Sequence, residues 1–308
     1  MSATMLSPGL SASERVDRIS GADLHYWMYR DGLPGSDGDP RTVVMVHGLR
    51  GTHHGLELIA EALPGRRVVI PDLPGFGDSG PMVGRRHDVD GYAQALIELI
   101  ELLGGRIRPV VLLGHSFGSV VAARVASLAP ELLHRLVLVN PIATLPLRGP
   151  RVVMSGLTSA YYALGKALPI RMGRRWLSSK WLVLAASRAM TRTKDKQLRR
   201  FVDDSHLRYF SRFHSPAVLD ESFQASVTST VADYADSLTT PTLMIAGETD
   251  EIAPLAGQYE LAGRLADAEL VVIPEVGHLV HYETPTPAAD AIEQFLSTPS
   301  PNTRRSNQ

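Results

Sequence analysis

One serine in the chain has the neighbours that a nucleophile needs. Ser116 lies in the run GHSFG at 114–118, directly after the apolar segment 109–113 and directly before the helical segment FGSVVAARVASL. A serine on a tight strand-to-helix turn needs small residues two positions to either side, because the strand and helix backbones pass close together there. Gly114 and Gly118 meet this need. The pattern predicts that Ser116 is a covalent nucleophile, although the same string also occurs in ordinary glycine-rich turns.

Four further motifs follow predicted strands in an order typical of one superfamily. His-Gly at 47–48 follows TVVMV, a D-x-x-G-x-G-x-S pattern spans 72–79, Gly-Glu-Thr-Asp spans 247–250, and Gly-His stands at 277–278. Together with 114–118, these motifs resemble those of the α/β-hydrolase superfamily, and the resemblance extends along the chain apart from the tail. It implies an α/β fold with a mostly parallel central sheet flanked by helices. It also implies a serine esterase or lipase-like activity and an inserted helical cap.

The resemblance also implies the partners of the serine. A serine hydroxyl is a weak nucleophile at neutral pH and must pass its proton to a nearby base, which a carboxylate orients. The matching positions are His278 for the base and Asp250 for the acid. His281 remains an alternative base, and Glu248 and Glu251 remain alternative acids.

Backbone donors are expected for the oxyanion of the tetrahedral intermediate. The superfamily uses the N–H of the residue after the nucleophile, which is Phe117, and the N–H of the residue after the His-Gly pair, which is Leu49. Phe117 also begins a predicted helix, whose N-terminus favours negative charge. We interpret His115 as a packing residue.

Two other patterns could indicate a cofactor or a metal. Residues 75–80 satisfy G-x-G-x-x-G, but Pro81 and a polar run follow them in place of a helix, so the hydrolase loop is the better interpretation. His53 and His54 lie near His47 without an H-E-x-x-H helix or a third acidic ligand, so we interpret them as loop histidines. We therefore expect neither a cofactor nor a metal.

The elements that must position these residues alternate between short apolar runs and amphipathic stretches, as in a parallel sheet wrapped by helices. Buried strands are predicted at 42–46, 67–70, 110–113, 136–139, 242–246 and 270–273, after an antiparallel edge pair at 15–19 and 24–29. Helices are predicted at 91–103, 117–128, 257–265 and 287–296. The alternation of strands and helices stops over 142–235, which we interpret as the helical cap. The core then comprises 1–141 and 236–297, and the tail 298–308 is predicted to be disordered.

Bulk composition excludes several classes of protein. Of 308 residues, 44% are hydrophobic and 20% charged, as in a soluble globular protein, and the absence of cysteine excludes disulfides and thiolate chemistry. No apolar run approaches the length of a membrane span, and no secretory signal pattern stands at the N-terminus. The net charge of −1 gives no indication of nucleic-acid binding. The expected location is the cytoplasm.

Charge and aromatic residues are unevenly distributed along the chain. Residues 148–212 hold fifteen Lys and Arg against three Asp, while the rest of the chain holds sixteen basic and twenty-nine acidic residues. Ten of the nineteen aromatic residues lie in 142–235, which predicts an apolar pocket and a hydrophobic ester substrate. A basic cap with apolar runs also predicts peripheral contact with anionic membranes, although pairing with the acidic core is an equal alternative.

Other reactions on the same triad remain open. Carbon–carbon bond hydrolysis and acyl transfer use the same residues within the superfamily, and some members of the fold act as ligand receptors. A serine at position 116 argues against the branches that place an aspartate there.

Overall fold

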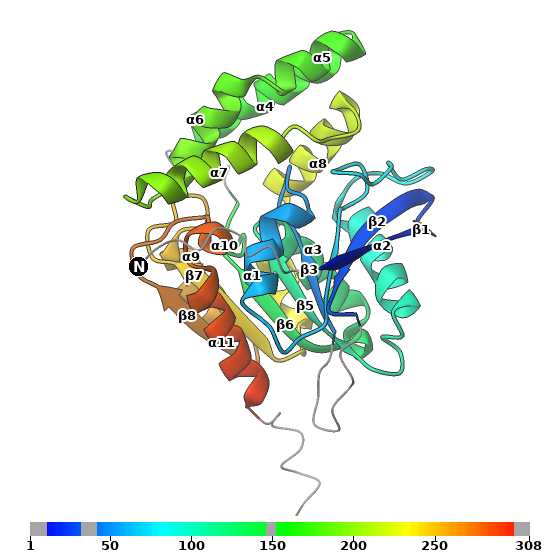
Figure 1. The fold of residues 1–308 in the computed structure, drawn as a ribbon, viewed down its shortest axis with the longest axis vertical. Helices are drawn as coiled ribbons and strands as arrows, with labels where there is room; N and C mark the ends of the chain where they lie inside the picture. The colour runs from blue at the N-terminus through cyan, green and yellow to red at the C-terminus, as the bar shows by residue number, and fades with distance from the viewer. Residues whose placement is uncertain (1–10, 32–41, 146–151, 299–308) are drawn as a thin grey trace, which may run out of the picture.

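The protein is built around one eight-stranded sheet (Figure 1). The computed structural model describes residues 11–31, 42–145 and 152–298. The strands are β1 (Ala12–Ile19), β2 (Ala22–Tyr29), β3 (Val43–Val46), β4 (Val68–Pro71), β5 (Val110–His115), β6 (Leu133–Val139), β7 (Thr242–Gly247) and β8 (Ala268–Ile273), in the order β1-β2-β4-β3-β5-β6-β7-β8. β2 is antiparallel to both neighbours, and all pairs from β4 to β8 are parallel. The predicted fold class is therefore confirmed.

The parallel strands are apolar throughout because both faces of the sheet are covered. Along β3, Val44 and Val46 pack into the core beneath α2 (Val89–Leu102) and α3 (Phe117–Leu128). Val43 and Met45 point to the opposite face, which α1 (Glu57–Glu61) and α11 (Pro285–Ser297) cover. This alternation follows from the two-residue period of a strand.

Most helix predictions agree with the structure. The segments 91–103, 117–128, 257–265 and 287–296 correspond to α2, α3, α9 (Leu255–Arg264) and α11. The short helices α1 and α10 (Val280–Glu283) were not predicted, because four or five residues show no full helical period. Single turns of 3-10 helix are η1 (His53–Leu56), η2 (Pro130–Leu132), η4 (Val231–Asp233) and η5 (Ala235–Ser237).

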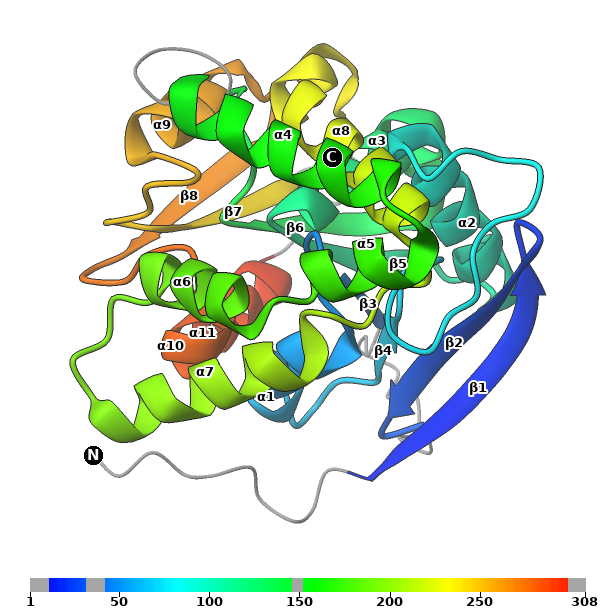
Figure 2. The same cartoon turned by 90° about the horizontal axis from the view of Figure 1, so that it is seen from above.

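Between β6 and β7, the residues that the structure describes form five α-helices: α4 (Val152–Ala167), α5 (Ile170–Leu177), α6 (Lys180–Met190), α7 (Lys196–Tyr209) and α8 (Pro216–Thr228). They cover the edge of the sheet where the parallel strands end (Figures 1 and 2). All five fall inside the predicted insertion 142–235, whose status as a separate cap remains a prediction. Of the predicted tail, only Thr298 is among the described residues. No helix in the described ranges has the length and apolar character needed to cross a membrane.

Two glycines allow β3, β5 and α3 to touch backbone to backbone. A Cβ on Gly114 would lie 2.3 Å from the carbonyl oxygen of Gly118, and a Cβ on Gly118 would lie 2.4 Å from the carbonyl oxygen of Val46. Both distances are far below a van der Waals contact, and the opposing atoms are backbone and cannot rotate away. Any side chain here would therefore separate the strand from the helix.

We expect Gly118→Ala to destabilise the protein by about 2 kcal/mol or more, because its methyl group would displace the backbone of β3. Gly263→Ala is the matched control, since that glycine lies in α9 and a Cβ there meets nothing within 4 Å. The control should be neutral or stabilising by up to about 1 kcal/mol. Urea unfolding measures the free energy of unfolding of both variants. Equal stability of Gly118→Ala and the wild type would contradict the close approach.

Candidate active site

Ser116 stands on a strained turn between β5 and α3. Its φ of 53° and ψ of −122° lie outside the regions that side-chain-bearing residues favour. The backbone of Ser116 is held by a hydrogen bond from its N–H to the carbonyl of Val139, at 3.0 Å. The hydroxyl faces a cavity above the carboxyl ends of the strands.

The structure brings Ser116, His278 and Asp250 into one hydrogen-bonded chain. His278 Nε2 lies 2.8 Å from Ser116 Oγ, and His278 Nδ1 lies 2.7 Å from Asp250 Oδ2. The second carboxylate oxygen of Asp250 accepts the backbone N–H groups of Ile252 and Ala253, at 2.7 and 3.0 Å. A charged carboxylate orients Nδ1–H toward itself, which leaves Nε2 to accept the serine proton.

Asp250 is buried, yet its pKa lies below the ordinary aspartate value. Burial alone would raise this pKa, but the positive charge of His278 and the hydrogen bonds from His278, Ala253 and Ile252 outweigh it. The carboxylate therefore stays ionised at neutral pH.

Asn140 joins the two loops that carry the acid and the histidine. It is fully buried at the end of β6, with a φ of 44°. Its side-chain amide donates to the carbonyl of Gly277 at 2.9 Å, and its side-chain oxygen accepts the N–H of Gly247 at 3.0 Å. No sequence motif predicted a role for Asn140. Its place directly after a buried strand was the available signal.

The alternative base and acids lie in other surroundings. His281 is buried against His115, and its pKa is held well below the ordinary value by burial first and then by the neighbouring histidines. Glu248 accepts the N–H of Glu275, and Glu251 is exposed and pairs with an arginine at 2.9 Å. The structure joins none of these three side chains to Ser116.

His115 packs beneath the site. Its Nε2 donates to the carbonyl of His278 at 3.1 Å, and burial, followed by the charge of His278, lowers its pKa to about 3. His115 therefore remains neutral at physiological pH and supports the backbone of His278.

Two residues with unpaired backbone N–H groups line the cavity beside Ser116. Leu49 follows β3 and Phe117 begins α3, and both line the cavity. Within the described ranges, neither N–H donates a hydrogen bond to the protein. Unpaired donors at a helix N-terminus and an adjacent loop are suited to binding an anionic oxygen.

The loop at 72–79 is held by hydrogen bonds within it, such as Asp78 N–H to Asp72 Oδ2 at 2.9 Å, and by one to His47. His47 Nε2 accepts the N–H of Leu73 at 2.9 Å, and a Cβ on Gly77 would lie 1.8 Å from the Asp72 carboxylate. The next helix, α2, begins only at Val89. The G-x-G-x-x-G string inside this loop therefore lacks the helix N-terminus that a dinucleotide phosphate needs.

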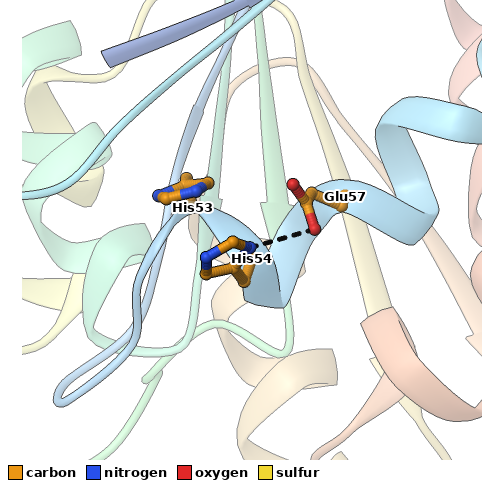
Figure 3. Close-up of side chains that lie close together, drawn as sticks. All are labelled: His53, His54 and Glu57. Atoms are coloured by element: carbon orange, nitrogen blue, oxygen red, sulfur yellow. Dashed lines mark hydrogen bonds and ion pairs between the residues drawn. The ribbon is translucent and has the colours of Figure 1, made fainter. Parts of the chain in front are cut away.

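His53, His54 and Glu57 form a compact cluster on η1 and α1 (Figure 3), with candidate ligand atoms within 4.8 Å of one another. His53 hydrogen-bonds to the Asp72 carboxylate at 2.9 Å, and His54 Nδ1 lies 3.2 Å from Glu57. The ring of His53 stacks on Trp27, while the ring of His54 stacks on a tyrosine of α7. Because packing and hydrogen bonds already occupy these side chains, we assign no metal to the cluster.

The cavity above Ser116 has a volume of about 880 Å³. Its roof comes from the inserted helices, through apolar and aromatic side chains that include Tyr162, Ala186, Met190, Phe210 and Phe223. Arg50 lies in its wall and is tied by hydrogen bonds to the carbonyls of Phe210 and Leu177, at 3.0 and 2.8 Å. The volume is that of a site for a small organic molecule.

Arg50 and His206 also line this cavity, and the sequence patterns predicted neither. His206 projects from α7, is buried, and has no hydrogen-bond partner for Nδ1 within the described ranges. Burial lowers its pKa to about 4, so it is neutral at physiological pH. Neither residue belongs to a motif. The folding of the inserted helices over the sheet brings His206 to the same cavity as Arg50.

Known proteins resemble this chain over nearly its whole length. A mouse sn-1-specific diacylglycerol lipase, ABHD11, is 27% identical over 94% of this chain and 92% of its own length. A Pseudomonas 2-hydroxy-6-oxononadienedioate/2-hydroxy-6-oxononatrienedioate hydrolase is 27% identical over 83% of this chain and 87% of its own length.

Solved structures share the fold. An alpha/beta hydrolase from a Medee basin deep-sea metagenome library, MGS-M2, superposes with a TM-score of 0.74 at 20% identity, covering 93% of this chain and 98% of its own. A family model described as the alpha/beta hydrolase family matches residues 43–291, which include Leu49, Ser116, Asp250 and His278. The chain therefore belongs to the alpha/beta hydrolase family.

Proposed function

We propose that the protein is a serine hydrolase that cleaves hydrophobic carboxylic esters through an acyl-enzyme intermediate. The observation that carries this proposal is the chain of two short hydrogen bonds from Ser116 through His278 to Asp250 beneath an apolar cavity. Each residue has the partner that its role requires.

In the first step, Ser116 Oγ attacks the ester carbonyl carbon while its proton passes to His278 Nε2. Asp250 stabilises the resulting imidazolium, and the carbonyl oxygen takes the negative charge. The Leu49 and Phe117 N–H groups are proposed to bind that oxygen. Collapse of the intermediate expels the alcohol, which takes the proton from His278.

In the second step, water replaces the alcohol. His278 removes a proton from the water, whose oxygen attacks the acyl carbon and releases the carboxylic acid. Ser116 then recovers its proton. Buried His115, with its lowered pKa, contributes no competing charge beside His278.

The apolar wall of the cavity supports a hydrophobic acyl group. A diacylglycerol lipase among the relatives is consistent with a lipid ester. Carbon–carbon hydrolysis is a second candidate, because relatives with that activity match at similar identity. Their named substrates carry carboxylates, whereas Arg50 in this cavity already donates to backbone carbonyls of the inserted helices. A substrate with carboxylates would need a free cation in the cavity, so the engagement of Arg50 favours the ester.

A fluorophosphonate probe is expected to label the wild type at Ser116, because only an activated serine forms the phosphonyl adduct. Ser116→Ala should lose labelling and about four powers of ten or more in p-nitrophenyl ester turnover. Intact mass and peptide mapping measure the adduct. Full labelling of Ser116→Ala would assign the nucleophile elsewhere.

His278→Ala is expected to lower kcat by about three powers of ten or more, because Ser116 loses the acceptor of its proton. His281→Gln is the comparison, since this buried neighbour does not contact Ser116 Oγ. We expect it to retain activity within about tenfold. Steady-state kinetics on the folded variants compare the two histidines as candidate bases. A larger loss of kcat for His281→Gln would reverse the assignment of the base.

The preference among esters of different acyl chain length should reflect the apolar lining of the cavity. From acetate toward octanoate, kcat/KM should rise by up to about fourfold per methylene, because each buried CH₂ contributes favourable transfer free energy. Ala186 on α6 lines the cavity and its neighbour Ala185 is exposed. Ala186→Phe should shift the preference to short chains, while Ala185→Phe should leave it unchanged. A wild type that prefers acetate, unaffected by Ala186→Phe, would refute the hydrophobic acyl site.

A further inference from the structure

Helices α5 and α6 expose apolar side chains that a monomer in water would ordinarily bury. Trp181 is 83% exposed, Ile170 64% and Met172 58%, and Trp176 and Leu182 are also exposed. These five residues, which we call the apolar set, all lie within the single stretch 170–182. Exposed apolar residues are normal when scattered, but a set of large ones on adjoining helices marks an interaction site.

The same stretch carries unpaired positive charge. Arg171, Arg175 and Lys180 are exposed, and none forms an ion pair with an acid in the described ranges. The chain has no Asp or Glu between Glu131 and Asp195. The alternative expected from sequence, in which basic residues of the inserted helices pair with the acidic core, therefore does not apply to these three side chains.

Basic residues near the stretch do pair where an acid is within reach. Lys166 bonds to Asp220 at 2.8 Å, and Arg212 pairs with Asp78. Among the described residues, exposed cations without an ion pair therefore remain on α5 and the start of α6, and also near the start of α7, at Lys194, Lys196, Arg199 and Arg200. On α5 and α6 they share the stretch 170–182 with the apolar set. An anionic partner with an apolar interior is the occupant that satisfies both features.

These helices lie on the outer side of the inserted segment, away from the sheet (Figures 1 and 2). Helix α6 presents Ala186 and Met190 to the cavity and Trp181 to solvent. A surface that touched Trp181 would therefore lie about one helix diameter, roughly 10 Å, from the cavity.

We propose that the exposed surface of α5 and α6 docks on anionic lipid bilayers. The apolar set enters the interface between headgroups and acyl chains, with the tryptophans at headgroup level, as amphipathic interfacial helices do. Arg171, Arg175 and Lys180 bind lipid phosphates. Docking does not depend on the proposed ester hydrolysis, so each can fail without the other.

Sedimentation with sucrose-loaded vesicles tests the docking. The full chain should bind phosphatidylcholine vesicles that contain about one third phosphatidylglycerol, and bind weakly to pure phosphatidylcholine. High salt should weaken the binding. Ser116→Ala should bind as the wild type does, which separates docking from catalysis.

Two variants address the two features of the surface. Arg171→Glu/Arg175→Glu should weaken binding by at least about twenty-five-fold, because each surface charge contributes about fivefold. Trp181→Ser should weaken it by about tenfold through lost apolar burial. All three positions are exposed, so folding should be preserved, and circular dichroism checks this.

Matched controls lie at the opposite end of the sheet. Ile107 is 87% exposed in the loop before β5, and Arg108 beside it is exposed as well. Ile107→Ser and Arg108→Glu should leave vesicle binding unchanged. Equal losses in these controls would mean non-specific adsorption and would overturn the proposal.

Three further results would overturn it. One is the absence of binding to either vesicle. Another is vesicle binding that depends on the arginines but not on Trp181, which would indicate electrostatic adsorption without insertion of the apolar set. The third is a dimer in sedimentation equilibrium that Trp181→Ser abolishes, which would make the surface an interface between two copies of the chain.

Discussion

Backbone contact between β3, β5 and α3 sets the geometry of the candidate site. Gly118 lies so close to Val46 that only a hydrogen atom fits between their backbones. This contact allows α3 to start directly at the end of β5, which places Ser116 at a positive φ. It also brings Phe117 beside the loop after β3, which carries Leu49, the second proposed donor. One steric constraint therefore positions both the hydroxyl and the groups that would bind the developing oxyanion.

The rest of the chemistry depends on strand direction. β3, β5, β7 and β8 run parallel, so the loops that carry Leu49, Ser116, Asp250 and His278 all leave the same edge of the sheet. β5 and β8 are separated by two strands, at roughly 4.8 Å per step. The loop after β8 must therefore fold back toward β5. Asn140, at the end of intervening β6, bonds to both later loops and holds them in that position.

The inserted helices shape the cavity of the candidate site. They form the roof over Ser116, and Arg50 ties them to the loop after β3 through the carbonyls of Leu177 and Phe210. The guanidinium of Arg50 also lies over the Phe210 ring, at 4.9 Å from its centre. The roof therefore has an inner face that is apolar and an outer face where cations and large apolar side chains meet solvent.

The sequence by itself determined the succession of strands and helices along the chain, the candidate nucleophile and the general position of its candidate partners. These depend on local patterns: apolar runs of strand length, glycines on either side of Ser116, and short motifs directly after strands. Such patterns are set by backbone sterics and burial over a few residues, so they can be recognised without coordinates.

Tertiary structure decided which of the nearby candidates meet. His278 and His281 are three residues apart in the chain, and only the path of the loop after β8 brings His278 to Ser116. The roles of Asn140 and Arg50 also arise from contacts between distant segments, which no local pattern encodes. The exposure of Trp181 and the burial of Leu177 were likewise undetermined, because both are apolar residues in a basic helical stretch. Packing against the other inserted helices selects which one faces water.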